Sequence, residues 1–151
     1  MKFIATNELG RLSRWLRILG FDTVYQKKDN IGSLIITALR ENRFILTRRK
    51  TKIGDLEKRT LILKSEKLEE QIKEVIEKLN LKIDQNEMFT RCTICNSKLI
   101  EIEKEKIFSL VPPYVYKTQE RFYFCNNCNK AYWQGSHWGN VSNTLKKLGI
   151  I

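Results

Sequence analysis

The sequence predicts an α/β fold in which a parallel sheet flanked by helices is followed by a small β-rich unit. Two observations predict it. Between residues 2 and 63, short apolar strands alternate with segments of helical period, as in a parallel sheet. After residue 88 the chain becomes aromatic, strand-forming and cysteine-containing. We therefore expect two units, residues 1–88 and residues 89–151.

The composition is that of a globular, basic protein. Its 151 residues are 42% hydrophobic, and 28 lysines and arginines against 17 acidic residues give a net charge of +11. Such an excess favours a polyanionic partner such as nucleic acid, although charged surfaces also serve solubility. No apolar run reaches the ~18 residues of a membrane helix, and charges interrupt the N-terminus where a signal peptide would lie. We expect a cytoplasmic protein without membrane contact.

The stretch from residue 2 to residue 20 predicts a buried strand, Phe3–Ala5, that leads into a helix. Asn7 is the expected N-cap of this helix and Gly20 its C-cap. Apolar residues recur on one side at helical spacing, and the opposite side carries Arg11, Arg14 and Arg17, about one turn apart. These arginines form either a solvated face or a stripe that contacts phosphates.

The next segments continue the alternation of strands and helices. Residues 21–25, 43–47 and 60–63 have the composition of strands, whereas residues 33–42 and 67–81 have the period of amphipathic helices. Loops that follow parallel strands meet at one edge of the sheet. We therefore expect Thr6, the loop at residues 26–30 and the basic segment at residues 48–52 to lie together.

Four cysteines form two C-x-x-C pairs after residue 90: Cys92, Cys95, Cys125 and Cys128. Two such knuckles supply four thiolates at the spacing of a closed tetrahedral site, for which structural Zn²⁺ is the usual ion. Disulfides are the alternative, although they are uncommon in a reducing compartment. An iron cluster or a redox pair is a further alternative. We expect zinc to be required for this ribbon to fold.

An aromatic segment follows the second knuckle and contains Trp133, His137 and Trp138. The histidine is either an acid/base catalyst or a structural or RNA-stacking residue, and the absence of a neighbouring carboxylate favours the second role. The segment Val111–Tyr114 contains two prolines and predicts a rigid turn between strands of the ribbon.

Together these segments resemble the Mut7-C RNase domain family, a PIN-like nuclease fold with a C-terminal zinc ribbon. The resemblance covers nearly the whole chain. It implies an RNA-directed protein whose relatives are predicted to cut phosphodiester bonds with a divalent ion, Mg²⁺ or Mn²⁺, held by carboxylates. It rests on LGRLSRWLRILGFD at residues 9–22, ENRFILTR at 41–48, RCTICN at 91–96, Val111-Pro112, and WQGSHW at 133–138.

The chain departs from the family pattern at two acidic positions. Thr6 stands where the resemblance implies an aspartate after the first strand, and Arg49 stands where it implies one after the third. Asp29 and Asp22 remain as the acidic candidates for catalysis, and the position of Asp22 at a strand start suggests a structural role. A positive Arg49 would repel a divalent ion, while its planar guanidinium suits phosphate.

The sequence leaves three functional hypotheses. The preferred one is a PIN-like protein that has lost its catalytic metal and binds structured RNA or a ribonucleoprotein such as the ribosome. The second is an active ribonuclease with a rearranged carboxylate set drawn from Glu8, Asp29, Glu41 and Asp55. The third is an adaptor whose zinc ribbon binds a protein. The predicted RNA contacts of the first are Arg11, Arg14, Arg17, Arg48, Arg49, Lys50, Trp133, His137 and Trp138.

Overall fold

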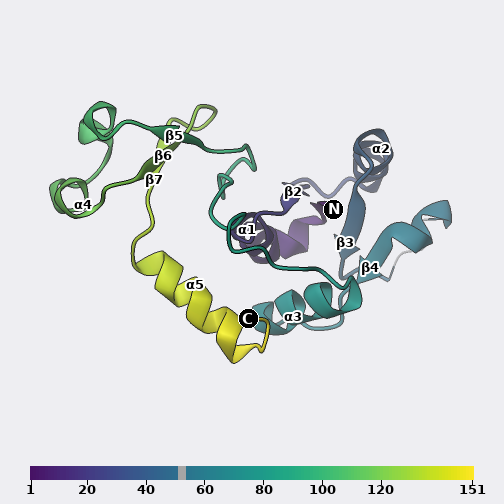
Figure 1. Cartoon of the computed structure of the whole chain (residues 1–151). Coiled ribbons are helices and arrows are strands. Elements are labelled where there is room, and N and C mark those ends of the chain that lie inside the picture. Colours follow the sequence, from purple (N-terminus) through teal and green to yellow (C-terminus); the bar gives the residue numbers. More distant parts are fainter. Residues whose placement is uncertain (51–53) are drawn as a thin grey trace.

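Four short parallel strands form the first sheet of the computed structural model, in the order β2-β1-β3-β4 (Figure 1). The structure describes residues 1–50 and 54–151, without the side chains of residues 54–55 and 136–137. The predicted parallel sheet with flanking helices is therefore confirmed. Its elements are β1 (Lys2–Ala5), α1 (Gly10–Ile18), β2 (Asp22–Tyr25), α2 (Ile31–Glu41), β3 (Phe44–Thr47), β4 (Thr60–Ile62) and α3 (Leu68–Lys78).

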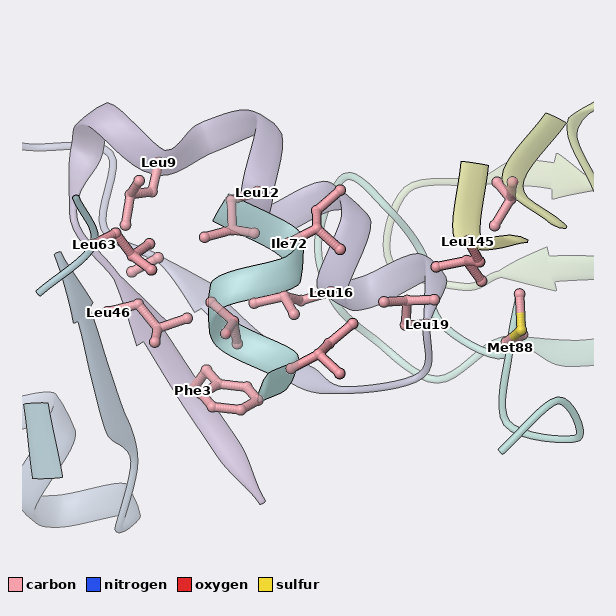
Figure 2. Close-up of a cluster of buried hydrophobic side chains, with 14 residues drawn as sticks. Phe3, Leu9, Leu12, Leu16, Leu19, Leu46, Leu63, Ile72, Met88 and Leu145 are labelled. Atoms are coloured by element: carbon pink, nitrogen blue, oxygen red, sulfur yellow. The ribbon is translucent and has the colours of Figure 1, made fainter. Parts of the chain in front are cut away.

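The two faces of this sheet bury different side chains, because successive residues of a strand point to opposite sides. Phe3 and Ala5 of β1 join the larger core, in which α1 and α3 pack together. Figure 2 shows Leu12 and Leu16 close to Ile72, with Leu19, Leu145 and Met88 at one end of the same cluster. Ile4 points to the other face and joins Leu34 of α2 in a smaller core. Helix α1 thus has one side that is buried in the larger core and another side on which Arg11 and Arg14 are exposed.

The ends of α1 agree only partly with the sequence prediction. Gly20 has φ +96°, and Phe21 donates its amide to the Leu16 carbonyl at 2.9 Å, which is the Schellman termination expected of a C-cap glycine. The prediction of Asn7 as the N-cap was wrong. Residues Asn7–Leu9 instead form a 3-10 turn after Thr6, and Leu9 occupies the N-cap position of α1.

The second unit is a three-stranded antiparallel sheet in the order β5-β6-β7, which confirms the small β-rich ribbon. Its strands are β5 (Ile100–Ile102), β6 (Phe122–Cys125) and β7 (Lys130–Tyr132). The predicted proline turn lies between β5 and β6, where Pro113 begins the short helix α4 (Pro113–Thr118). Among the described residues, no helix has the length and apolar character needed to cross a bilayer.

The last helix, α5 (Ser136–Lys147), leaves the ribbon and runs back toward α3 (Figure 1). Its Val141 and Leu145 are buried in the same core as Leu16 of α1 and Ile72 of α3. A helix that belongs by sequence to the second predicted unit therefore completes the core of the first.

Candidate functional site: a cysteine cluster and a polar strand edge

The four cysteines of the two knuckles lie together at the start of the ribbon. Their sulfur atoms all lie within 4.8 Å of one another, with 3.9 Å between Cys92 and Cys128 and 3.4 Å between Cys95 and Cys125. In a tetrahedral site with Zn–S bonds of about 2.3 Å, sulfur atoms are about 3.8 Å apart. Four thiolates at these separations fit a closed zinc site. Such a site would cross-link the two knuckles and leave no open position for a substrate.

The two knuckles share one backbone turn. An asparagine follows the second cysteine of each pair and adopts a positive φ, 75° at Asn96 and 53° at Asn129. The amide of each asparagine donates to the carbonyl of the first cysteine of its knuckle, at 2.9 Å and 2.8 Å respectively. Asparagine tolerates this conformation better than most residues, so the C-x-x-C-N spacing encodes the turn that aims both thiols at one point.

Arg17 attaches the first knuckle to helix α1. Its side chain is buried, its Nε donates to the Thr23 carbonyl at 2.9 Å, and its Nη1 donates to the carbonyls of Thr93 and Ile94 at 2.9 and 3.1 Å. These carbonyls lie inside the first C-x-x-C pair. Arg17 was predicted to contact RNA; in the structure its guanidinium donates to the backbone of the knuckle and of β2.

A second set of polar contacts fixes the same joint. The Asn96 side chain accepts a hydrogen bond from the Thr23 amide at 3.0 Å and donates to Asp22 at 2.7 Å. Asp22 also pairs with Arg43 at 2.8 Å and lies 3.9 Å from Arg91. Burial raises the pKa of Asp22, but the hydrogen bonds from Asn96 and Arg43 and the positive charges outweigh it and lower the pKa.

The other end of the parallel sheet, where β1 and β3 finish, carries a network centred on Glu8. The Glu8 carboxylate accepts hydrogen bonds from the Thr6 hydroxyl at 2.6 Å, the Arg48 amide at 2.9 Å and the Thr47 hydroxyl at 3.3 Å. Partial burial raises the pKa of Glu8, but the hydrogen bonds from Thr6 and the Arg48 amide and the charge of Arg49 outweigh it and bring the pKa below its ordinary value of 4.5.

Arg49 extends across this edge between two carboxylates. Its Nη1 pairs with Asp29, its Nη2 donates to the side chain of Asn7, and its Nε lies 3.8 Å from Glu8. The hydrogen bond to Asp29 raises the pKa of Arg49 above its already high ordinary value. The expected meeting of Thr6, the loop at residues 26–30 and the segment after β3 is thus found for Arg49, although residues 51–53 lie outside the described part of the chain.

Comparison with known proteins agrees with this architecture. A family model described as "Mut7-C RNAse domain" matches residues 1–145. The chain belongs to the Mut7-C RNAse domain family. A search of curated proteins finds no match. The motif at residues 9–22, on which the resemblance to the Mut7-C family rested, now has a structural reading, since Arg17, Gly20 and Asp22 all contact the first cysteine knuckle or the segment that leads into it.

The carboxylates that could replace the missing Mut7-C aspartates do not converge. Glu8 and Asp29 lie at the end of the sheet where the strands finish, whereas Asp22 begins β2 and pairs with Arg43 at the opposite end. Glu41 also pairs with Arg43, at 2.9 Å. The substitute carboxylates Glu8, Asp29 and Glu41 are therefore split between two ends of the sheet, and Asp22 makes contacts of the structural kind that its position at a strand start suggested. The side chain of Asp55 lies outside the described residues.

From the sequence, Glu8 was named only as one of four candidate carboxylates and was not placed against Thr6 and Thr47. The 3-10 turn at Asn7–Leu9 instead folds its carboxylate back toward Thr6 and Thr47. The signal in the sequence was a pair of threonines, one closing each of two adjacent strands. Their hydroxyls can donate to a single carboxylate placed between them.

The remaining RNA-contact predictions fall into two groups. Arg11, Arg14 and Lys50 are exposed, and Arg48 lies 3.8 Å from Glu66. Trp133 packs against the ribbon core, and Trp138 stacks on Phe89 with ring centroids 6.3 Å apart, so both indoles also stabilise the fold. The side chain of His137 lies outside the described residues.

We expect native mass spectrometry to find one zinc ion per chain. Replacing Cys125 by serine should abolish binding, because a closed site needs all four thiolates. Chelation should unfold the ribbon. It should also lower the melting temperature of the whole chain, because α5 follows the ribbon in the sequence and packs Val141 and Leu145 into the core of the first unit. Native protein that carries no metal while retaining its near-UV circular dichroism would contradict the assignment.

Arg17→Ala should destabilise the chain by about 1.5–3 kcal/mol, because it removes charged hydrogen bonds from buried carbonyls. It should also speed transfer of zinc to a chromogenic chelator, since the first knuckle loses its attachment. The matched control is Arg14→Ala on the exposed side of the same helix, for which we expect a change within about 0.5 kcal/mol in urea unfolding. Equal effects of the two substitutions would refute the attachment role.

The network at Glu8 predicts an acid dependence of stability. Because the pKa of Glu8 is lower in the folded chain than its ordinary value of 4.5, its contribution is complete above that value. It is lost as the pH falls through the folded pKa. The stability difference between wild type and Glu8→Gln, measured by urea unfolding, should therefore shrink over this interval; a difference that is constant with pH would show that ionisation of Glu8 is not involved.

Proposed function

We propose that this Mut7-C chain binds RNA and does not cut it. The observation that carries the proposal is the position of Arg49, whose guanidinium lies between Glu8 and Asp29 at the edge where the family places its divalent ion. This guanidinium already pairs with Asp29 and approaches Glu8 at 3.8 Å. The strand edge therefore favours an RNA-binding role over metal-dependent hydrolysis.

The charge argument is one of magnitude. A unit positive charge repels another about 4 Å away by about 4 kcal/mol at an effective dielectric of ~20, and a divalent ion doubles this. Metal-assisted phosphodiester hydrolysis needs carboxylates that converge on the ion. Here Thr6 contributes a neutral hydroxyl, and that hydroxyl donates to Glu8. The residues present therefore do not fit Mg²⁺ or Mn²⁺.

Binding of RNA is supported by the charge of +11 and by the membership of an RNAse family. Arg11, Arg14 and Lys50 remain exposed for phosphate contacts. The closed cysteine site, most simply filled by zinc, would stabilise the ribbon as a second surface. Structured RNA or a ribonucleoprotein such as the ribosome is the partner that we propose, with the chain located in the cytoplasm.

A second candidate function is favoured by an apolar cluster on the ribbon. Phe108 and Tyr114 are 65% and 70% exposed, and Leu110 is 48% exposed. Phe108 also meets Tyr116 edge to face, with ring centroids 5.0 Å apart. Exposed apolar groups gathered in this way are typical of protein contacts. An adaptor that carries a protein partner on its ribbon would use this cluster.

The test is a single incubation of a fluorescent RNA hairpin with the protein in the presence of Mn²⁺. We expect the RNA to remain intact on a denaturing gel while its anisotropy reports binding. That binding should weaken steeply between about 50 and 200 mM salt, because phosphate contacts release counterions. Cleavage that Asp29→Asn abolishes would establish the ribonuclease instead, and a lack of RNA binding with a protein retained by the ribbon would favour the adaptor.

A gain-of-function control examines the same edge directly. The double substitution Thr6→Asp with Arg49→Asp would restore two acids beside Glu8 and Asp29, so it should bind Mn²⁺ in a calorimetric titration while the wild type does not. Lys50→Asp, which changes the charge by the same sign next to Arg49, serves as the comparison. Equal Mn²⁺ binding by wild type and the double variant would refute the role assigned to Arg49.

A further inference from the structure

Several arginines around the parallel sheet have partners within the chain. Arg17 donates to backbone carbonyls, while Arg43, Arg49 and Arg91 lie within 4 Å of carboxylates. Three cations that line one groove lack such carboxylate partners. Within the part of the chain that the structure describes, no carboxylate lies within salt-bridge distance of Arg11, Arg14 or Lys27.

These three cations line one groove between α1, the end of β2 and the first cysteine knuckle. The groove has a volume of about 410 Å³, and none of its lining residues is acidic. Its lining residues are Gly10, Arg11, Ser13, Arg14, Arg17, Tyr25, Lys27, Thr93 and Ile94. Charges of one sign in a concave site raise the local potential, so the groove is suited to an anion.

The shape of the groove depends on two close approaches. A Cβ atom at Gly10 would lie 3.3 Å from the Tyr25 hydroxyl, so glycine lets the phenol lie against the start of α1. That hydroxyl donates to the Asn7 carbonyl at 2.6 Å, which fixes the ring as a wall. The lining also contains Ile94, which is 56% exposed. Cations beside an aromatic ring and an apolar side chain are the usual surroundings of single-stranded RNA.

We propose that this groove, lined by Arg11, Arg14 and Lys27, binds the phosphates of a single-stranded RNA segment, with Tyr25 and Ile94 contacting its sugars or bases. The inference rests on the proposed RNA-binding function and names its site. The volume lies within the range of about 300–1,000 Å³ of pockets for small molecules. Such a site accommodates a short segment of one strand, and a paired helix does not enter it.

The first cysteine knuckle forms one wall of the groove but contributes no positive charge to it. Thr93 and Ile94 lie between the first two cysteines, and Arg17 donates hydrogen bonds to the backbone carbonyls of both. The groove therefore exists only while the knuckle is folded. This arrangement links the metal site to RNA binding through shape.

The experiment measures anisotropy of a fluorescent single-stranded oligouridine with zinc-loaded, full-length protein over a series of salt concentrations. Arg14→Gln with Lys27→Gln removes two phosphate contacts, so the slope of log K against log salt should become shallower by about 1.4. Affinity at about 0.1 M salt should fall by about 25-fold on the same relation. Both side chains are exposed, and an unchanged melting temperature will verify that the fold is kept.

The matched control is Lys78→Gln with Lys82→Gln, which removes the same charge from exposed positions that do not line the groove. We expect its slope to equal that of wild type. If the groove variant and the control lose affinity equally, the site is wrong while the proposed function stands. Equal loss of affinity by a hairpin duplex and by oligouridine in the groove variant overturns the preference for a single strand. Wild type that binds no RNA overturns the proposed function together with this inference.

Discussion

The attachment of the cysteine knuckle to helix α1 is the contact on which the rest of the structure depends. Arg17 belongs to α1 and donates to carbonyls of the knuckle, while the side chain of Asn96 accepts a hydrogen bond from the Thr23 amide of β2. Four thiolates around a zinc ion would carry a net charge of −2, which the buried guanidinium would partly offset. The side chain of Arg17 thus satisfies backbone acceptors and joins the two sheets, which share no strand.

At the opposite end of the sheet an arginine also pairs within the chain, but there its partners are carboxylates. Where a metal-dependent nuclease of this fold needs converging carboxylates, this chain has an arginine that pairs with Asp29 and approaches Glu8. The threonines that close β1 and β3 donate to the remaining carboxylate. Glu8, Thr6, Thr47 and Arg49 therefore satisfy one another at this edge, whereas the buried Nε of Arg48 has no hydrogen-bond partner among the described residues.

Much of the fold follows from patterns in the sequence. The period of the apolar residues predicts the strands and helices of the parallel sheet, and the cysteine spacing predicts the cluster, because both signals are local. The use of individual arginines is not local. Arg14 and Arg17 occupy the same helical face by spacing, yet one is exposed and the other is buried against a knuckle some 76 residues later. The return of Glu8 toward Thr47 was missed because it depends on a 3-10 turn that propensity does not indicate.

The position of Val141 and Leu145 in the N-terminal core has a consequence for biosynthesis. In a chain made from its N-terminus, the residues of all four parallel strands and of α1 and α3 are synthesised before these two residues. Until Val141 and Leu145 are made, this core lacks two of its buried side chains, and the apolar surface that they cover is open to water. The residues of the cysteine ribbon lie between the two parts in the sequence, so the core is completed only after the whole ribbon has been synthesised. Apolar surface left open for that time is a site for aggregation.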